Sequence, residues 1–565
     1  MEYLILAKIY EKLEKTSAKL EKTRILAELF SKTPRDDLPK VVLLSQSLVY
    51  PPYTQMEVGI ATQLMMRAIS KATGYSVREI EELYKKFGDL GSAAEECAKK
   101  KKQLTFFKKK LTIDFVFKTL QELGKITGEK SQEKKLSILS GLLLNAEPLE
   151  IRYIVRTVLG ELRIGVAEGI VRDAIAQAFL IPKGIEKEKA IEAVEYAWNI
   201  LSDFGEVARI AKEEGIEGLK KVKPVLGRPI QVMLGLKAES IEEVLKRHPK
   251  VIVEFKYDGL RMQCHKKGEK VWIFTRRLEN ITKQFPDVVE VIKKYIKAKE
   301  CIIEGEAWPI DRKTGKPLPF QKLSQRIQRK YDIEKMMREI PVQLNLFDCV
   351  YVDGKLLIDK PLHERFKILS SIVKEVSGKL MLAERIVTGN LKEIEEFYHK
   401  ALRLKQEGVF LKNPDSPYIF GRHVGGWYKI KPTMETLDLV IIGATWGEGR
   451  RAKWLSSYVL ACRDPDTGKF LACGMMGTGL TEEQFDMMTK ILKPLIIKEK
   501  GREVKVKPKI VVEVGYQEIQ KSPNYESGFA LRFPRLIRVR NDKGPREADT
   551  IQRIKHLYET QGKAG

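Results

Sequence analysis

The sequence predicts a multi-domain protein in which an all-α region is followed by a mixed α+β region and a small β-barrel. Three observations support this prediction. The 565 residues are too many for one hydrophobic core, and length alone favours roughly three or four domains. Apolar residues follow a helical period up to about residue 220 and an alternating period after it. After Pro432 a new series of short strands begins, with a length and pattern that suit a barrel.

The helical prediction rests on the spacing of apolar residues. Leu4, Ile5, Ile9 and Leu13 follow a helical period near the start of the chain. Residues 220–234 combine proline, glycine and positive charge between two differently patterned regions, which is typical of a linker. The helical period recurs at Ile191, Val194, Trp198 and Leu201. The expected helices are separated by the turn glycines Gly74, Gly124 and Gly160.

The remaining two regions are expected to be rich in strands. Helical stretches such as 363–376 lie between the strands of the middle region, which favours a mixed α+β domain. The last region contains one helical segment, 481–496, and ends in a basic stretch, 531–543. The expected strands are 251–256, 270–277, 301–308, 344–352, 408–413 and 426–431, then 437–446, 457–465, 470–477 and 509–516.

The composition points to a polyanionic partner. With 102 basic and 76 acidic side chains, the net charge is +26. A charge of this size attracts a polyanion at long range, with nucleic acid the first candidate and an acidic membrane surface the second. The six cysteines lack CxxC spacing, which disfavours a zinc site and fits a reducing compartment. Without a long apolar run or a cleavage site, we expect a soluble protein that is not secreted.

One stretch carries a lysine at the end of an expected strand. Alternation in residues 251–256 places Glu254 and Lys256 on one face, and Asp258–Gly259 then turns the chain. Arg261 follows, and a neighbouring cation disfavours the ammonium form, so the amine could act as a nucleophile. Taken alone, the simpler interpretation is an edge-strand lysine that guards against aggregation.

The middle region adds further groups that suit a nucleotide. Glu304 and Glu306 share a face and could hold magnesium or ribose hydroxyls, while Trp427, Lys429 and Lys431 share another face that suits a polyphosphate. Each fragment alone could be the solvated face of a sheet. Together they supply what the transfer of a nucleotide to an enzyme requires. Between them lie Arg276, Phe347, Asp348 and Glu407.

These fragments form an ordered series of motifs. KYDGLR, FTRRLENIT, EGEAW, LFD, EGVFLK, WYKIKP and FPRLIRVRNDKGP occur in the order and rough spacing of the covalent nucleotidyltransferases. The first region adds GELRIGVAEGIVRDAIAQAF. The whole chain resembles an archaeal, eukaryote-like ATP-dependent DNA ligase.

The resemblance implies three domains and a reaction. It implies an all-α DNA-binding domain at 1–224, an α+β nucleotidyltransferase (adenylation) domain at 225–432, and a β-barrel OB-fold domain with a C-terminal helix at 433–565. Such an enzyme uses ATP and Mg²⁺ or Mn²⁺. It seals nicks in double-stranded DNA during replication and repair, through a lysyl-AMP and then a DNA-adenylate, joining a 5′-phosphate to a 3′-hydroxyl.

The resemblance also implies a role for individual residues. Lys256 would attack the α-phosphate of ATP and expel pyrophosphate, and Glu306 and Glu407 would hold the metal ion. Other nucleotide contacts would come from Glu254 beside the adenine, Phe347 stacked on it, Arg261, Arg276, Glu306 and Trp427, the pair Lys429 and Lys431 at the α-phosphate, and Arg540, Asp542 and Lys543 closing over the nucleotide.

Two sites are expected in the helical region. Arg163, Gly165 and Gly169 resemble a DNA-binding segment whose glycines bring backbone N–H groups close to a phosphate, with a packing glycine as the alternative. Gln103, Phe106 and Phe107 resemble a shortened motif that binds a sliding clamp, although folded neighbours could bury the aromatic pair. The expected partners are therefore nicked duplex DNA and a sliding clamp, with no membrane, and the chain is expected to be a monomer.

Two departures and two rival functions accompany the resemblance. Arg422 lies one residue further from Trp427 than is usual, which puts a nucleotide contact by Arg422 in doubt, and Tyr428 stands where a leucine is frequent. One rival is an RNA ligase or an RNA-capping guanylyltransferase, against which the long helical region argues. The other is a DNA-binding or clamp-tethering protein with an inactive transferase domain.

Overall fold

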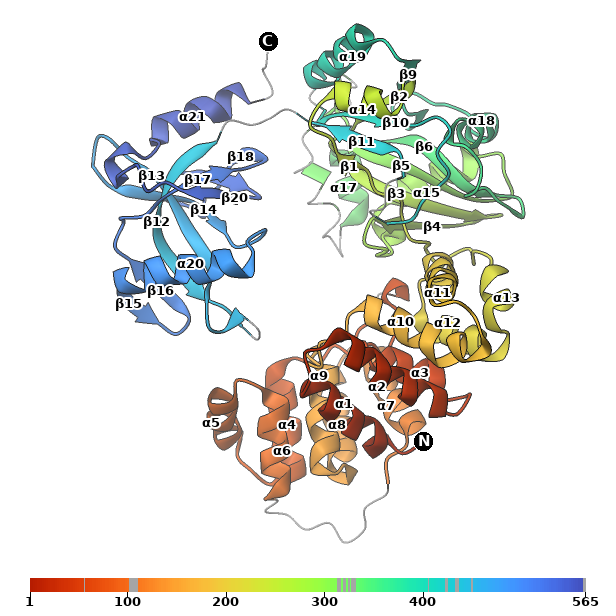
Figure 1. Ribbon diagram of the computed structural model, residues 1–565, viewed down its shortest axis with the longest axis vertical. Helices are drawn as coiled ribbons and strands as arrows, with labels where there is room; N and C mark the ends of the chain where they lie inside the picture. Colours follow the sequence, from red (N-terminus) through yellow and green to blue (C-terminus); the bar gives the residue numbers. More distant parts are fainter. Residues whose placement is uncertain are drawn as a thin grey trace.

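The computed structural model shows three successive regions of different composition (Figure 1). Helices come first, a mixed region of helices and two sheets follows, and a β region ends the chain. Gln103, Phe106, Phe107 and Arg422 lie outside the described residues. The structure describes residues 1–54, 56–100, 110–311, 314, 317–318, 322–323, 326, 332–404, 406–421, 425–431, 436–448 and 451–561.

The first region is helical, as predicted. Of the residues whose spacing predicted its first helix, Leu13 is fully buried and Ile5 is 47% exposed, and Tyr3, Leu6 and Tyr10 are also fully buried. The helices are α1 (Tyr3–Glu14), α2 (Lys19–Lys32), α3 (Leu38–Leu44), α4 (Thr62–Thr73), α5 (Val77–Phe87), α6 (Leu90–Lys99), α7 (Ile113–Lys125), α8 (Ser131–Asn145), α9 (Pro148–Val158), α10 (Glu168–Phe179), α11 (Lys187–Leu201), α12 (Phe204–Glu213) and α13 (Gly215–Lys220).

Two sheets form the middle region. A five-stranded sheet has the order β1 (Leu236–Lys237), β11 (Trp427–Ile430), β10 (Gly408–Lys412), β2 (Val251–Lys256), β9 (Arg385–Thr388). The second has the order β4 (Lys270–Thr275), β3 (Leu260–Lys267), β5 (Glu300–Pro309), β6 (Val342–Val352), β7 (Lys355–Leu356), with β8 (Leu380–Leu382) parallel to β6. Around them lie α14 (Ile241–Arg247), α15 (Pro286–Tyr295), α17 (Ile333–Glu339), α18 (Leu362–Ile372) and α19 (Leu391–Arg403).

The position of β2 decides how its lysine is interpreted. Strands pair with β2 on both sides, so the interpretation of Lys256 as an edge-strand lysine was wrong. Glu254 is only 2% exposed, and the expected half-buried strand is therefore buried on both faces. The predicted alternation along β2 was correct, but the face that carries Glu254 and Lys256 is covered by the second sheet and does not face water.

The last region is a β domain with its own core. A seven-stranded sheet joins β12 (Leu437–Trp446), β13 (Leu455–Arg463), β14 (Phe470–Met476), β15 (Ile496–Lys500), β16 (Glu503–Val506), β17 (Val511–Gly515) and β20 (Arg535–Val539). A hairpin of β18 (Glu518–Lys521) and β19 (Phe529–Arg532) accompanies it, with α20 (Glu482–Leu492) and α21 (Ile551–Thr560).

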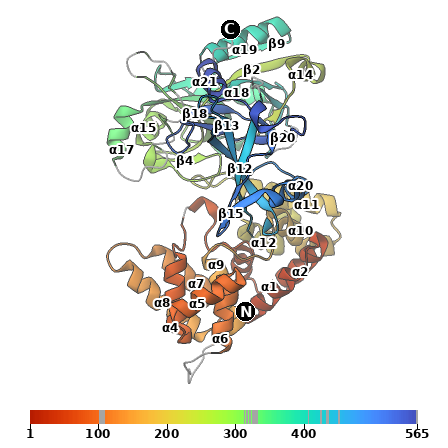
Figure 2. The same cartoon turned by 90° about the vertical axis from the view of Figure 1, so that its left-hand side faces the viewer.

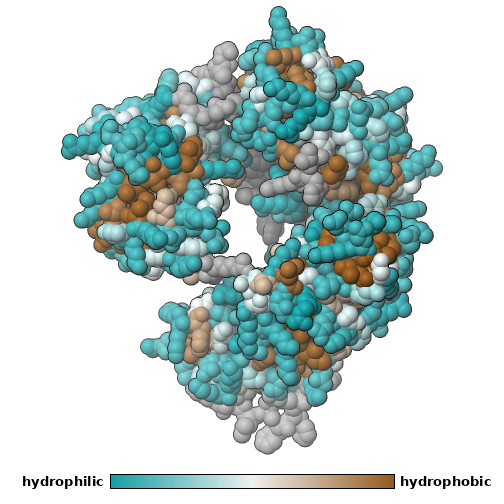
Figure 3. All heavy atoms as spheres, viewed as in Figure 1, coloured by the Kyte–Doolittle hydropathy of each residue, from teal (hydrophilic) through white to brown (hydrophobic). Residues whose placement is uncertain are grey.

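The three regions surround an open space. Figure 2 shows the N-terminal helices below the other two regions, and Figure 3 shows an opening between all three. In the parts of the chain that the structure describes, no helix is long and apolar enough to cross a membrane.

The expected linker is an ordered strap and not a loose connection. The Gln231 N–H donates to the Asn199 carbonyl at 2.8 Å in the helical region. On the other side, Gln263 of β3 exchanges two hydrogen bonds with the backbone of Ile230, at 2.9 and 3.1 Å. His265, one strand repeat further on, accepts from the Gly227 N–H at 3.2 Å. Side chains of β3 thus hold the strap in place of a paired strand.

His265 gives this attachment a pH dependence. Burial lowers the pKa of His265 from 6.5 to about 3. Its contribution to stability is therefore fully present above the unfolded pKa and is lost as the pH falls from about 6.5 toward 3. Between pH 7 and 4.5 we expect the free energy of unfolding to fall by about 2 to 3 kcal/mol through this residue. Denaturant titrations of the wild-type protein and of His265→Asn at both pH values measure this fall. An equal fall in the wild type and in His265→Asn would show that His265 is not its source.

Candidate active site between the two sheets

Lys256 lies at the end of β2, beside a shared carboxylate. Its Nζ lies 2.9 Å from the Glu407 carboxylate, and the Glu407 N–H donates to the Lys256 carbonyl, also at 2.9 Å. Lys431 forms a second ion pair with the same carboxylate. Burial would raise the pKa of Glu407, but the two lysines outweigh it and hold that pKa below its usual value. Two amines and one carboxylate therefore converge at the end of the strand.

Two glycines allow this close approach. Gly408, directly opposite Lys256, has φ +137°, and a Cβ there would lie 2.1 Å from the Ile430 carbonyl. At Gly259, in the turn after Lys256, a Cβ would lie 2.5 Å from the Ala307 carbonyl of β5. The turn can therefore lie directly against the second sheet.

Glu254 sits deeper on the same face of β2. It lies opposite Phe410, which lies opposite Lys429, so the three residues form a row across the sheet. Its carboxylate is paired with Arg385 and with Lys412, and Lys412 is 2% exposed. Neither Arg385 nor Lys412 was predicted from the sequence. The alternation of Phe410 and Lys412 in the expected strand 408–413 was the available signal for Lys412.

The second sheet contributes the opposite wall. Arg261, Glu306 and Asn345 lie in one row across β3, β5 and β6. The Arg261 guanidinium lies 2.8 Å from Glu304 and 5.3 Å from the centre of the Phe347 ring. The Glu304 carboxylate therefore neutralises the charge of Arg261. The cation that shares a carboxylate with Lys256 is Lys431, through Glu407.

An aromatic cluster closes the inner end of this space. Phe347 and Trp427 contact each other edge to face with their centres 6.1 Å apart. The Lys412 ammonium lies 3.9 Å from the Trp427 ring centre and 4.6 Å from that of Phe347. This combination of aromatic faces, a buried carboxylate and cations suits a heterocyclic base with attached phosphates.

The carboxylates beside Lys256 fit a hard cation. Burial raises the pKa of Glu306 to about 7, although Lys256 and Arg261 oppose this. Within the described ranges, no set of three or more His, Cys, Asp or Glu side chains is arranged to hold a metal ion. Glu306 and Glu407 would therefore supply two ligands, and phosphate oxygens and water the others.

Four predicted residues lie outside the rows of facing residues described above. Arg276 is exposed, one residue beyond the Met262–Thr275 pair that links β3 and β4. Arg540, Asp542 and Lys543 lie in the C-terminal region, where they pair internally. Arg540 lies 3.0 Å and Lys543 2.6 Å from the Asp438 carboxylate, and Arg540 lies 2.8 Å from Asp542.

The predicted DNA-binding segment forms a groove in the helical region. Arg163 and Gly165 both have left-handed backbones, with φ +58° and +61°. With residues 45–47 they line a pocket of about 340 Å³. At Gly169 an added Cβ would meet nothing within 4 Å, so the packing alternative was wrong there. Beneath the groove, buried Lys22 donates to the carbonyls of Ile164 and Gly165 at 2.5 and 3.2 Å.

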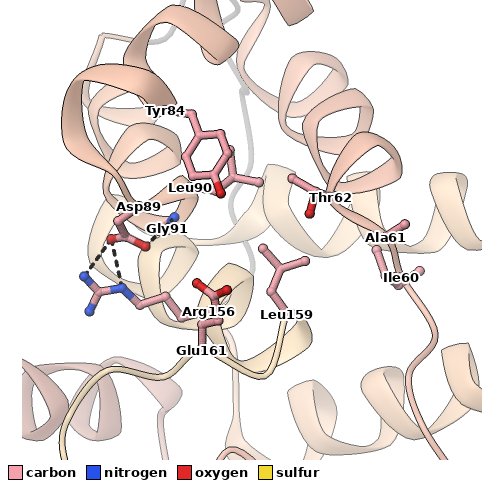
Figure 4. A pocket seen from close by; sticks show the side chains of 10 residues that line it. All are labelled: Ile60, Ala61, Thr62, Tyr84, Asp89, Leu90, Gly91, Arg156, Leu159 and Glu161. Atoms are coloured by element: carbon pink, nitrogen blue, oxygen red, sulfur yellow. Dashed lines mark hydrogen bonds and ion pairs between the residues drawn. The ribbon is translucent and has the colours of Figure 1, made fainter. Parts of the chain in front are cut away.

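An ion pair between Asp89 and Arg156 lines a second pocket of the helical region (Figure 4). This pocket has a volume of about 250 Å³. Asp89 accepts from the backbone at the start of α6 and from the Arg156 guanidinium, which lies 2.7 Å away. The Arg156 guanidinium also lies 2.8 Å from Glu14. These charges are matched within the protein, which is typical of a structural network.

The groove gives a prediction for DNA affinity. Lys22→Met removes the donor of the buried Ile164 carbonyl and of the more exposed Gly165 carbonyl, so we expect the affinity for nicked duplex to fall about tenfold. Because Lys22 is only 3% exposed, it contacts no phosphate, and the salt dependence should stay unchanged. Arg163→Ala is the control that should reduce the slope of log K against log salt by about 1. Titration of a labelled nicked duplex at several salt concentrations measures both; a reduced slope for Lys22→Met would contradict this assignment.

Comparison with known proteins identifies the family. The family model of the ATP dependent DNA ligase domain matches residues 232–431. The family model of the DNA ligase N terminus matches residues 2–176, and that of the ATP dependent DNA ligase C terminal region matches residues 451–543. The chain belongs to the ATP-dependent DNA ligase family. This ligase is accordingly an enzyme that uses ATP to seal nicks in DNA.

Relatives of similar length support this membership. A DNA ligase of Nanoarchaeum equitans is 49% identical, covering 99% of each chain. A DNA ligase of Thermococcus onnurineus is 49% identical over 99% of this ligase and 98% of the relative, and one of Archaeoglobus fulgidus is 46% identical over 98% of each. A solved structure named Pmar-Lig_PreS3 has the same fold, with a TM-score of 0.57 and 17% identity over 95% of this chain and 99% of that one.

Proposed function

We propose that Lys256 is the nucleophile that carries AMP during nick sealing. The observation that carries this proposal is the convergence of Lys256, Glu407 and Lys431 between two sheets whose inner end is lined by aromatic rings and cations. The Lys256 amine attacks the α-phosphate of ATP, a nitrogen–phosphorus bond forms, and the bond to pyrophosphate breaks. Glu407 orients the amine, and Lys431 is placed to receive an α-phosphate oxygen.

The same cleft accounts for binding of the nucleotide. Phe347 and Trp427 provide apolar surface for the base, and the Glu254 carboxylate is positioned for a base N–H. Lys429 shares the face of Lys431 one strand repeat away. Arg261, Arg276 and Glu306 supply the ribose and phosphate contacts. The 5′-phosphate of a nick then attacks lysyl-AMP, and the 3′-hydroxyl displaces AMP from the DNA-adenylate.

Glu306 and Glu407 are proposed to hold Mg²⁺ or Mn²⁺. The carboxylates suit a hard cation, and the raised pKa of Glu306 indicates that its negative charge lacks full compensation within the protein. When bound, the ion neutralises charge on the transferring phosphate.

The C-terminal region is proposed to move between steps. Arg540, Asp542 and Lys543 contact the nucleotide only if this region, as an OB-fold domain, closes over the adenylation domain. The domain boundaries are proposed to lie near 224/225 and 432/433. Binding of duplex DNA in the opening between the three regions is proposed, with Arg163, Gly165 and Gly169 on phosphates (Figure 3).

Clamp binding through Gln103, Phe106 and Phe107 remains a proposal from sequence alone. Phe106→Ala combined with Phe107→Ala should abolish binding to a purified archaeal sliding clamp, and unchanged affinity would reject the clamp assignment.

The monomeric state and the cytoplasmic, nucleoid-associated location proposed for this ligase also rest on the family resemblance.

A sealing assay tests the function against its rivals. Full-length protein, ATP and Mg²⁺ should convert a singly nicked DNA duplex to the joined strand. GTP in place of ATP tests a guanylyltransferase, and a nick between RNA ends tests an RNA ligase. Joining of RNA ends in preference to DNA ends would favour an RNA ligase. Binding of the duplex without any joining or lysine labelling would favour a DNA-binding protein with an inactive transferase domain.

A further inference from the structure

Tyr418 contributes a buried hydroxyl beside the candidate active site. Tyr418 follows β10 and precedes β11 in the chain, and it is 3% exposed. Its hydroxyl donates to Glu304 at 2.8 Å and accepts from the Met233 N–H at 3.0 Å. Burial keeps the pKa of Tyr418 well above its usual value, so the hydroxyl retains its proton. One oxygen therefore connects a buried carboxylate to the backbone of the strap.

Arg261 closes these contacts into a ring. Its guanidinium donates to Glu304 at 2.8 Å and to the Met233 carbonyl at 2.7 Å. Tyr418, Glu304, Arg261 and the Met233 backbone thus hold one another in sequence. Glu304 is fully buried and accepts a further hydrogen bond from Gln263 at 3.2 Å, so it has little freedom to shift.

The ring leaves one donor of Arg261 for a ligand. The buried Nε of Arg261 has no hydrogen-bond acceptor among the described residues. The guanidinium lies 5.3 Å from the centre of the ring of Phe347, which is proposed to contact the base. A buried donor of this kind is costly to leave unpaired, which indicates that an acceptor group of a ligand belongs there.

We propose that Tyr418 is a positioning residue for lysine adenylation, because its hydroxyl completes the ring that fixes Arg261 against the nucleotide. The inference rests on the proposed function of the cleft and adds to it a residue that belongs to none of the nucleotidyltransferase motifs. Since Met233 belongs to the strap that leads from the helical region, the ring also ties the nucleotide site to that segment.

Tyr418→Phe tests the proposal by removing only the hydroxyl. In initial rates of lysyl-AMP formation we expect the KM for ATP to rise about tenfold while kcat changes less than about twofold. Tyr458→Phe is the matched control, because the Tyr458 hydroxyl is also buried and donates to a backbone carbonyl, that of Leu455, at 2.6 Å in the C-terminal region. Its KM should equal that of the wild type. Should Tyr418→Phe fail to fold, Glu304→Gln weakens the same ring and should give the same rise.

A double-mutant cycle separates positioning from a general structural effect. If Tyr418 acts through Arg261, Tyr418→Phe changes the KM of an Arg261→Met protein by less than about twofold. A full additional tenfold rise there, or a wild-type KM for Tyr418→Phe alone, would overturn the inference. Absence of lysyl-AMP in the wild-type protein would instead overturn the proposed function, so the two failures are distinguishable.

Discussion

Lys256→Ala is expected to abolish both covalent labelling by ATP and sealing of an ordinary nick. The substitution removes the only atom assigned to bond with the α-phosphate, and loss of a nucleophile typically lowers turnover by roughly 10⁴-fold or more. Incubation with ATP labelled at the α-phosphate, followed by denaturation and electrophoresis, measures the covalent step. Strand joining on a nicked duplex measures the whole reaction.

A nick that already carries AMP provides the internal control. Joining of a DNA-adenylate needs the cleft but not the bond to lysine, so Lys256→Ala should retain measurable joining of this substrate. Lys267→Ala is a matched surface substitution, since Lys267 is 62% exposed on β3 and its nearest ion-pair distance, to Glu300, is 3.7 Å. It should behave as the wild type. Equal labelling of Lys256→Ala and wild type would exclude Lys256 as the site of attachment.

Arg365→Met is expected to lower the free energy of unfolding by about 3 to 5 kcal/mol. Arg365 and Asp348 are both fully buried, and the Arg365 guanidinium donates to Asp348 at 2.8 and 2.9 Å. It also donates to the Lys360 and Ser416 carbonyls at 2.6 and 3.0 Å. Removing the cation leaves the buried Asp348 carboxylate without its counter-charge and the Lys360 carbonyl without this donor, whereas the Ser416 carbonyl keeps the Leu362 N–H.

The size of this effect depends on burial and not on charge alone. Arg338→Met removes an exposed pair, in which Arg338 is 70% and Glu334 87% exposed, and should change stability by less than about 0.5 kcal/mol. Denaturant unfolding of the two variants, followed by tryptophan fluorescence, compares them directly. Similar losses in both would contradict the assignment of Arg365 as a buried structural cation.

The sequence predicted the strands of the middle region better than their environment. Alternation placed Glu254 and Lys256 on one face, and the structure confirms that arrangement. Periodicity does not report which strands pair, so the interior position of β2 could not be foreseen. The cations on Glu254, Arg385 and Lys412, lie 131 and 158 residues further along the chain, beyond the reach of any local pattern.

Two other differences have the same origin. The strap at 220–234 has the composition of a linker, yet hydrogen bonds from Gln263 and His265, about 35 residues downstream, order it. In α1 the spacing of Leu4, Ile5, Ile9 and Leu13 predicted the helix but not that tertiary packing would bury Tyr3 and Tyr10 and leave Ile5 exposed. Local pattern identified the elements, and contacts between distant segments determined what each face meets.

The most direct test of the account is to locate the adenylyl group on the protein. Wild-type protein incubated with ATP and Mg²⁺ is digested, and its peptides are analysed by mass spectrometry for the mass of one adenylyl group. We expect a single modified position, Lys256, which loses the group when pyrophosphate is added. Modification of Lys429, Lys431 or Lys412 in its place, with Lys256 unmodified, would contradict it.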